Sequence, residues 1–378
     1  MVRKGRLLML LRRLIKINSQ NPPGNEREIA LFVKAHLEKI GMKARIYEFK
    51  KKRSNVVAVR QGRHKKHSLL ITPHLDTVPA GKSWKYGPFS GTRCKDKVYG
   101  LGATDCKGNL ASLLEALQSL AEKKAVLPYT LVFAATADEE SGSAQGLIPL
   151  LAKGILAPSA AVVLDVSDFD IVVTQKGLMH LKVKVQGKRA HGAYPYRGKN
   201  AIDMSLRVLD EVKRYRFDYR RIPLLKFPTV NIGTIRGGDK VNIVADWCEF
   251  ELDYRFLPEM SAQRILRDLK TILRRHARKS KIEIEGIQKP YCIDTRHPLV
   301  ASLRAAMKKC RVRSHIRGSE GATVITFFQD KGIPAVATGF GAEACAHIAD
   351  EYARLSWLCK GAEVLEEFLT HYNAIKEE

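Results

Sequence analysis

The chain lacks any apolar run that could cross a membrane. Hydrophobic residues make up 45% of its 378 residues. Charged side chains nevertheless interrupt every stretch well before the roughly 18 to 20 residues of a spanning helix. We therefore expect no membrane partner and enough apolar residues for a buried core. A chain of this length exceeds the usual single domain, which predicts two domains or one domain with an insertion.

Paired cysteines are also missing. The seven cysteines are odd in number, scattered and free of any CxxC pair. This pattern argues against a disulfide framework and a thiolate zinc site, and it favours reduced thiols in a cytoplasmic protein. The N-terminal leucine cluster is interrupted by arginines, with no small-residue cleavage site after it, so a signal peptide is not expected. We predict instead an amphipathic first helix whose apolar face consists of Leu7, Leu10, Leu11, Leu14 and Ile15.

Acidic residues are few compared with basic ones. The chain has 39 Asp and Glu against 65 Lys and Arg, a formal charge of +26. Such a charge occurs in nucleic-acid-binding proteins. Here the basic residues are spread along the chain, with short clusters only at Lys50–Arg53, Arg63–Lys66 and Arg274–Arg278, and no aromatic residues alternate with them. We expect a solvated basic surface that favours anionic substrates, and no specific nucleic-acid partner.

A complete phosphate-binding loop is absent as well. The glycines of Gly100–Gly108 form only a GxG, and neither the GxGxxG fingerprint nor a full P-loop occurs. Earlier in the chain, Asn21–Gly24 is predicted to be a loop. Asn25 is predicted to cap a helix over Glu26–Ile40.

What the chain does contain is a series of apolar strands that end in polar residues. The strands with their polar ends are Leu69–Thr72 with His74 and Asp76, Thr130–Ala137 with Asp138–Glu140, and Ala160–Leu164 with Asp165. Ligand sites of open α/β sheets lie at the carboxyl ends of the strands, so we expect these side chains to gather there. Strands alternate with helices over this region. This predicts the α/β class, with a mostly parallel sheet and helices on both faces.

The pattern changes near Gly177. One-sided alternating strands and two helical segments follow, which predicts a separate, inserted α+β unit of ferredoxin-like type. The α/β pattern resumes after Pro290. We therefore predict a catalytic domain of residues 1–176 and 291–378, interrupted by an inserted domain of residues 177–290.

The polar residues favour a metal site over a nucleophilic triad. Two histidines and at least three carboxylates, one with a second Glu beside it, suit two divalent ions. A carboxylate can bridge such ions, which share a water and lower its pKa. A neighbouring carboxylate that binds no metal can then accept the proton of the water. Solvated strand ends are the alternative explanation for the acidic residues.

Four motifs together resemble the M20 metallopeptidase family, which includes acetylornithine deacetylases, succinyl-diaminopimelate desuccinylases, aminoacylases and several di- and carboxypeptidases. The motifs are His74–Pro79, Gly100–Gly108, Asp138–Glu140, and His347 with Asp350–Tyr352. The resemblance covers nearly the whole chain in order. It implies two divalent ions, Zn²⁺ first and Co²⁺ or Mn²⁺ as alternatives. The implied ligands are His74 and Asp165 for one ion, Glu140 and His347 for the other, and Asp105 as the bridge.

The resemblance also assigns the proton-transfer residue. Glu139 would be the general base and then the general acid, and Asp76 would orient His74. The chain departs from the family at Asp165-Val166-Ser167, where the deacylases commonly show Glu-Pro-Thr. Asp168 and Asp170 are therefore alternative ligands to Asp165.

The inserted unit resembles the lid or dimerisation domain of the family, which implies a homodimer. His191 matches the histidine that reaches across the dimer to stabilise the oxyanion. Asn242 and Arg255 match lid positions that hold the scissile carbonyl or a substrate carboxylate, but either residue could be a strand-surface polar group. Glu320 matches a substrate-contacting loop and could bind a substrate amine, or it could simply be the acid at a helix N-terminus.

The sequence leads to one main hypothesis and one close alternative. The main hypothesis is a metal-dependent amidohydrolase that removes an acetyl or succinyl group from an N-acyl amino acid. Ala134–Glu140 and Pro228–Gly233, followed by Gly237–Asp239, most resemble the acetylornithine deacetylase branch. The alternative is an exopeptidase with the same metal chemistry that acts on short peptides, which Asp165 in place of Glu favours. A non-catalytic, charge-driven binder would require a broken site, and every expected site type is filled.

Overall fold

A computed structural model describes residues 1–342 and 344–372, and these form two compact units. Unit 1 comprises Met1–Val173, Ile293–Arg317 and the described residues from Phe327 to Tyr372. Unit 2 comprises Thr174–Cys292 and Gly318–Thr326.

The segment Gly318–Thr326 lies outside the predicted inserted domain of 177–290, yet it packs within unit 2. Lys176 donates its backbone N–H to Ser319 O at 3.1 Å. Thr323 donates its backbone N–H to Gln175 Oε1 at 3.0 Å. These long-range hydrogen bonds have no signature in the local sequence.

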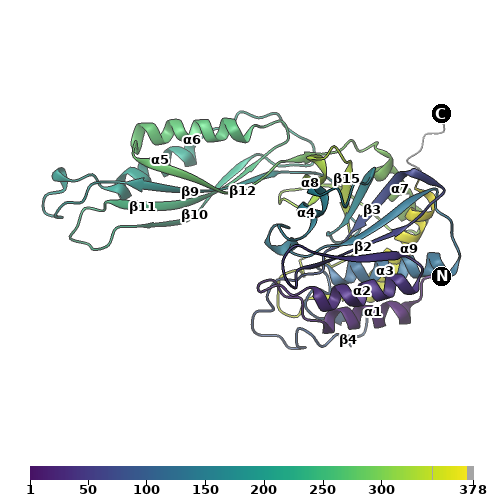
Figure 1. The fold of residues 1–378 in the computed structure, drawn as a ribbon. Coiled ribbons are helices and arrows are strands. Elements are labelled where there is room, and N and C mark those ends of the chain that lie inside the picture. The colour runs from purple at the N-terminus through teal and green to yellow at the C-terminus, as the bar shows by residue number, and fades with distance from the viewer. Residues whose placement is uncertain (343, 373–378) are drawn as a thin grey trace. The chain divides into compact units, whose positions relative to one another are not determined.

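The sheet of unit 1 runs in the order β1-β2-β6-β3-β7-β15-β8 (Figure 1). Its strands are β1 (Lys43–Glu48), β2 (Ser54–Arg60), β3 (His64–Thr72), β6 (Tyr129–Ala135), β7 (Ala160–Leu164), β8 (Ile171–Gln175) and β15 (Ala335–Thr338). The central pairs β6–β3, β3–β7 and β7–β15 are parallel, whereas the outer pairs are antiparallel. The predicted mostly parallel sheet is confirmed.

Helices cover both faces of this sheet. They are α1 (Lys4–Lys16), α2 (Arg27–Lys39), α3 (Lys107–Glu122), α4 (Leu147–Ala152), α7 (Pro298–Lys309), α8 (Ile325–Gln329) and α9 (Leu355–His371). Helices α1, α2 and α3 lie on one face (Figure 1). The chain passes from β3 through α3 to β6, and then from β6 through α4 to β7. These two connections cross the sheet in opposite directions, because β3 lies between β6 and β7. Right-handed crossovers therefore place α4 on the other face. The apolar face predicted for the first helix, from Leu7 to Ile15, is buried.

Short elements complete the chain. Strands β4 (Thr92–Cys94), β5 (Lys97–Tyr99) and β16 (Tyr352–Arg354) form a small antiparallel sheet in the order β16-β5-β4. Strands β13 (Tyr291–Cys292) and β14 (Ile316–Ser319) pair with β8, and η1 (Glu139–Ser141) and η2 (Pro195–Arg197) are single 3₁₀ turns. Pairing of β16 with β5 brings Glu351 beside the loop that precedes α3.

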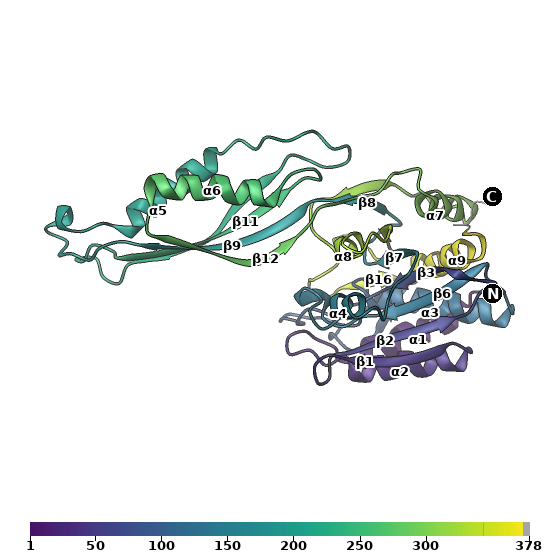
Figure 2. The same ribbon diagram turned by 45° about the horizontal axis from the view of Figure 1, so that its top comes forward.

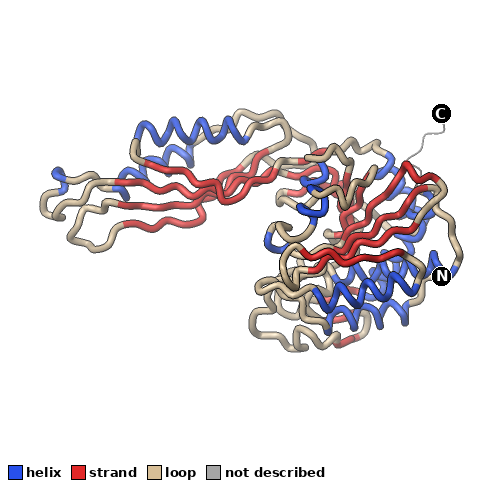
Figure 3. Tube along the Cα trace, viewed as in Figure 1, coloured by secondary structure: helices blue, strands red, loops and turns tan. Residues whose placement is uncertain are grey.

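Unit 2 is a four-stranded antiparallel sheet with two helices on one face (Figures 2 and 3). Its elements are β9 (Gly177–Gln186), α5 (Ala201–Arg214), β10 (Thr229–Gly237), β11 (Trp247–Phe256), α6 (Ala262–His276) and β12 (Ser280–Gln288). The strand order β10-β11-β9-β12 and the succession β-α-β-β-α-β are those of the ferredoxin-like fold, as predicted.

Alternation along the strands of unit 2 separates a buried face from a charged one. In β11, every second side chain from Cys248 to Phe256 is buried with the apolar residues of α5 and α6. The intervening positions form ion pairs across the strands, including Lys182 with Glu251 at 3.0 Å and with Glu285 at 2.9 Å. Across the described residues of both units, no helix combines the length and apolar character needed to span a membrane.

Replacement of Phe250 by Ala tests the packing of unit 2. Phe250 is 0% exposed, so the change is expected to destabilise unit 2 by about 3 to 5 kcal/mol through lost burial and a cavity. Urea unfolding and hydrogen exchange of β9 and β11 measure the loss. Phe227 is 62% exposed and provides the control, because Phe227→Ala should change the stability by less than about 0.5 kcal/mol. Equal losses in the two variants would contradict the proposed core.

Candidate metal centre

His74 follows β3 at the carboxyl edge of the sheet. Its side chain is 2% exposed, and its Nδ1 lies 3.0 Å from the backbone oxygen of Asp76. This contact places the proton on Nδ1 and leaves Nε2 as the ligand atom. Nε2 faces two carboxylates, Asp105 Oδ1 at 2.9 Å and Asp165 Oδ1 at 3.4 Å.

Asp105 lies between two histidines. Its Oδ2 is 3.2 Å from His347 Nε2, while its Oδ1 contacts His74. The loop that carries Asp105 is fixed by the buried Glu351, which accepts the backbone N–H groups of Gly102, Thr104 and Asp105 at 2.8, 2.8 and 3.0 Å. Three backbone donors on one carboxylate hold the position of Asp105.

Glu140 and His347 complete a second group. Glu140 follows β6 in η1, and its Oε1 lies 3.2 Å from His347 Nε2. In the part of the chain that the structure describes, two groups of side chains could hold a metal: His74 with Asp105 and Asp165, and Asp105 with Glu140 and His347. The ligand atoms of each group lie within 4.8 Å of one another. The structure thus brings the five expected ligands together, with Asp105 shared.

The donor set fits divalent cations. Each group offers imidazole nitrogen and carboxylate oxygen, the ligands of zinc and related ions. Burial raises the pKa of Asp165 to about 6, although the hydrogen bond to His74 opposes this shift. Burial and the charge of Asp165 raise the pKa of Glu139 well above its usual value. Carboxylates that repel one another in a buried site are stabilised by positive charge between them.

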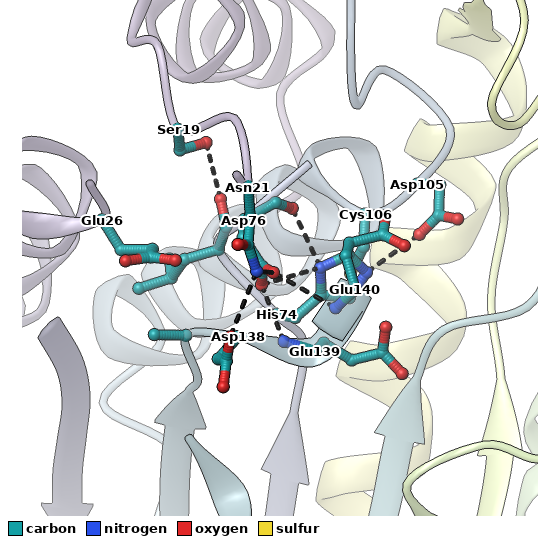
Figure 4. A network of polar contacts seen from close by, with 12 residues as sticks. Ser19, Asn21, Glu26, His74, Asp76, Asp105, Cys106, Asp138, Glu139 and Glu140 are labelled. Atoms are coloured by element: carbon teal, nitrogen blue, oxygen red, sulfur yellow. Dashed lines mark hydrogen bonds and ion pairs between the residues drawn. The ribbon is translucent and has the colours of Figure 1, made fainter. Parts of the chain in front are cut away.

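Asp76 contacts both His74 and the turn after β6. Its carboxylate is predicted to orient His74, and its Oδ1 lies 3.6 Å from His74 Nδ1, while its backbone oxygen makes a shorter contact with the same nitrogen at 3.0 Å. The carboxylate also accepts the backbone N–H groups of Glu139 and Glu140, each at 3.1 Å (Figure 4). Asp76 therefore fixes the turn that carries both glutamates.

The alternative ligands Asp168 and Asp170 are not members of either group among the described residues. Asp170 forms an ion pair with Arg317 at 2.6 Å. Asp165 directly follows β7 and donates its backbone N–H to Thr338 O at 3.2 Å, which places it at the strand end beside His74. The shorter side chain of Asp, compared with the Glu expected for deacylases, still reaches the group.

The four remaining predicted residues belong to unit 2, at two ends of its sheet. His191 and Asn242 are neighbours, because Gly192 donates its N–H to Asn242 O at 2.8 Å. Arg255 lies at the other end of β11 and makes two hydrogen bonds to Asp253, at 2.8 and 3.0 Å. Glu320 forms an ion pair with the buried Lys176 at 2.5 Å.

Several supporting residues were not identified from the sequence. They are the buried Asn21, Glu26, Arg53 and Glu351. Two of them could have been found, since Asn21 lies in the Asn-Pro-Pro-Gly loop and Glu351 lies in one of the recognised motifs. Arg53 belongs to a basic cluster that was expected to be solvated, and no local signal separates it from its exposed neighbours.

Comparisons with known proteins identify the family of the chain. The model of peptidase family M20/M25/M40 matches residues 70–371. An acetylornithine deacetylase of Photorhabdus laumondii subsp. laumondii is 29% identical over 320 residues, which cover 80% of each chain.

Solved structures of M20 proteins share the fold. An M20 family metallo-carboxypeptidase of Sulfolobus solfataricus superposes with a TM-score of 0.81 at 24% identity, over 97% of this chain and 99% of that one. A dinuclear metal binding peptidase of the M20 family from Bacillus subtilis superposes with a TM-score of 0.76 at 17% identity, over 97% of both chains.

Removal of one imidazole tests the two-group arrangement. The parent protein is expected to bind two divalent ions, and His347→Ala only one, because the group of His74, Asp105 and Asp165 stays complete. Equilibrium dialysis followed by metal analysis measures the stoichiometry. His297→Ala, which alters a histidine outside both groups, should still bind two ions. Two ions on His347→Ala would contradict the arrangement.

The affinity of the second group should depend on pH. Hydrogen bonds to Asp105 and Glu140 raise the pKa of His347 to about 10 in the metal-free protein, so its imidazole is protonated at pH 7. An ion that takes Nε2 must displace this proton. We expect the affinity for Mn²⁺ to increase by up to about tenfold per pH unit from about pH 6.5 to 8, measured by calorimetric titration. A pH-independent affinity for this ion would contradict a protonated His347.

Proposed function

The chain belongs to peptidase family M20/M25/M40, and we propose on this premise that it removes an acetyl or succinyl group from an N-acyl amino acid. The observation that carries the proposal is the pair of ligand groups that share Asp105, with Glu139 beside them but in neither group. The 29% sequence identity to an acetylornithine deacetylase, over 80% of the chain, supports the choice of substrate class. The basic surface suits an anionic substrate.

Two divalent ions fit the donor set, with Zn²⁺ proposed first and Co²⁺ or Mn²⁺ as alternatives. When bound, such ions supply Lewis-acid polarisation of a carbonyl and acidification of water. His74 and Asp165 would hold one ion, Glu140 and His347 the other, and Asp105 both. The backbone contacts of Asp105 and Glu140 fix these carboxylates before any ion arrives, which reduces the cost of assembling the site.

Glu139 is the proposed proton carrier. Its carboxylate accepts a proton from the attacking water and later delivers it to the nitrogen of the leaving amino acid. In the absence of metal, burial and the charge of Asp165 raise the pKa of Glu139. Positive charge beside Glu139 would lower this pKa and favour the carboxylate form that accepts the proton. The hydrogen bond from its backbone N–H to Asp76 keeps the carboxylate at the site.

Residues of unit 2 are proposed to contact the substrate. His191 Nδ1 accepts the N–H of Ala193 at 3.0 Å, which places the ring proton on Nε2. This tautomer can donate to the developing oxyanion across a homodimer formed through unit 2. Asn242, Arg255 and Glu320 are proposed substrate contacts. All seven cysteines are free, which supports the proposed cytoplasmic location.

An exopeptidase is the second candidate. The same ligand groups would serve peptide hydrolysis, and Asp165 replaces the glutamate that deacylases commonly carry. The carboxypeptidase with a closely similar fold supports this candidate. The two candidates differ in the group on the carbonyl side of the scissile bond, which is an acetyl or succinyl chain in one and an aminoacyl residue in the other.

A substrate panel separates the two candidates. The best N-acetyl or N-succinyl amino acid is expected to have a kcat/KM at least about tenfold above that of the best dipeptide. The reason is that a site shaped for the acyl group leaves the charged amine of a dipeptide without a matching partner. Ninhydrin detection of the released amine measures both classes, and chelator-treated protein provides the blank. Preference for dipeptides would establish the exopeptidase instead.

Replacement of the proposed proton carrier tests the mechanism. Glu139→Gln keeps the size of the side chain but cannot accept the proton, so kcat should decrease by a factor of about 10² to 10⁴. Both ions should remain bound, because Glu139 is in neither group. Glu28→Gln changes an exposed glutamate of α2 and should retain the parent kcat. An unchanged kcat in Glu139→Gln would refute the assignment.

A further inference from the structure

A buried polar network lies behind the metal centre, on the side of the loop before α2. It contains Glu26, Arg53, Asp138, Asn21 and Asp76, whose exposed fractions are 0%, 6%, 4%, 5% and 0%. Figure 4 labels four of them, Glu26, Asp138, Asn21 and Asp76. Three carboxylates thus share one guanidinium and one amide. None of these residues belongs to the two ligand groups.

Arg53 anchors one end of the network. Its Nε and Nη2 each donate to Glu26, both at 2.8 Å, and Nη2 also donates to Asp138 Oδ1 at 2.9 Å. The chain makes room for the guanidinium at Gly24, where a Cβ would lie only 2.4 Å from Arg53 Cζ. A planar, fixed fork of donors matches this arrangement, and a lysine cannot reproduce it.

Asn21 connects Asp138, a partner of Arg53, to the turn that carries Glu139 and Glu140. Its Nδ2 donates to Asp138 Oδ1 at 3.2 Å and to Asp76 Oδ2 at 2.9 Å, which uses both hydrogens of the amide. Asp76 accepts the backbone N–H groups of Glu139 and Glu140. Asp138 directly precedes Glu139, so covalent bonds and hydrogen bonds together form a closed ring around this turn.

The turn needs such support. Asp138 has a φ of 67°, in the left-handed region that is unfavourable for a residue other than glycine. Its carboxylate accepts from Arg53, Asn21 and the backbone N–H of Gln145, the last at 2.9 Å. These donors hold Asp138 in this conformation, and the conformation of Asp138 sets where the next two side chains point.

We propose, building on the function proposed above, that Arg53 is a positioning residue. Through Asp138 and Asn21 it sets the backbone of the Glu139–Glu140 turn, and thereby both the proton carrier and one ligand of the second metal group. The competing explanation is a purely structural ion pair, in which Arg53 and Glu26 only attach the loop before α2 to β2.

The main experiment compares Arg53→Met with Arg6→Met. Arg6 makes a similar two-point contact with the buried Glu115, at 2.5 and 2.8 Å, between α1 and α3, and so controls for the loss of a guanidinium–carboxylate pair. Arg53→Met is expected to reduce kcat 10- to 100-fold with KM within about twofold, and to weaken one of two Mn²⁺ binding events about 10- to 100-fold. Arg6→Met should lower Tm but leave these quantities within twofold.

A third measurement needs neither substrate nor metal. Hydrogen exchange of the amides of Glu139 and Glu140 should be faster in metal-free Arg53→Met than in the parent, and unchanged in Arg6→Met. If the parent hydrolyses no amide, the proposed function fails, while the exchange rates still decide the role of Arg53.

Asn21→Ala provides the second variant, because it breaks the ring of hydrogen bonds and leaves the Arg53–Glu26 ion pair in place. It replaces Arg53→Met if that protein does not fold. Its effects should resemble those of Arg53→Met, and the double variant should be less than additive, as for two members of one network. Unchanged exchange and Mn²⁺ affinity in these variants, or equal effects in Arg6→Met, would overturn the proposal.

Discussion

The mutual repulsion of partly buried carboxylates at the carboxyl edge of the sheet is the constraint on which the rest of unit 1 depends. Asp105, Glu140 and Asp165 converge there with two histidines. The chain holds each carboxylate through backbone contacts from behind, with Glu351 supporting the Asp105 loop and Asp76 supporting the turn of Glu140. Carboxylates held close together in this way are strongly stabilised by a positive charge placed between them.

The parallel sheet explains why residues so distant in sequence can meet. Strands β6, β3 and β7 are neighbours and point the same way, so the residues that follow them emerge at one edge. Crossover helices on both faces leave that edge free for loops. The segment after unit 2 returns to the same sheet, where β15 pairs with β7 in parallel. His347 follows β15, so it reaches a site formed mainly by the first half of the chain.

Local patterns were sufficient for the fold, because apolar periodicity and strand alternation report directly on which side of an element is buried. The face of α1 and the β-α-β-β-α-β order of unit 2 are examples. They were insufficient where burial depends on a distant partner. Asn25 is predicted to cap a helix that starts at Glu26, whereas Glu26 itself is the cap residue of α2 and its buried side chain accepts from Arg53. The spacing of His74 and Asp76 predicts the side-chain contact between them, at 3.6 Å, but not the shorter contact that the backbone oxygen of Asp76 makes with the same ring.

The shared position of Asp105 has a thermodynamic consequence. Its two oxygens face different histidines, His74 and His347. Any charge placed on one side of this carboxylate alters how strongly the other side attracts a second charge, so the two occupancies cannot be independent. Linkage requires the effect to be reciprocal, with the same free energy in both directions. One carboxylate thus makes the centre a single cooperative unit, whose response to metal concentration is set by both halves together.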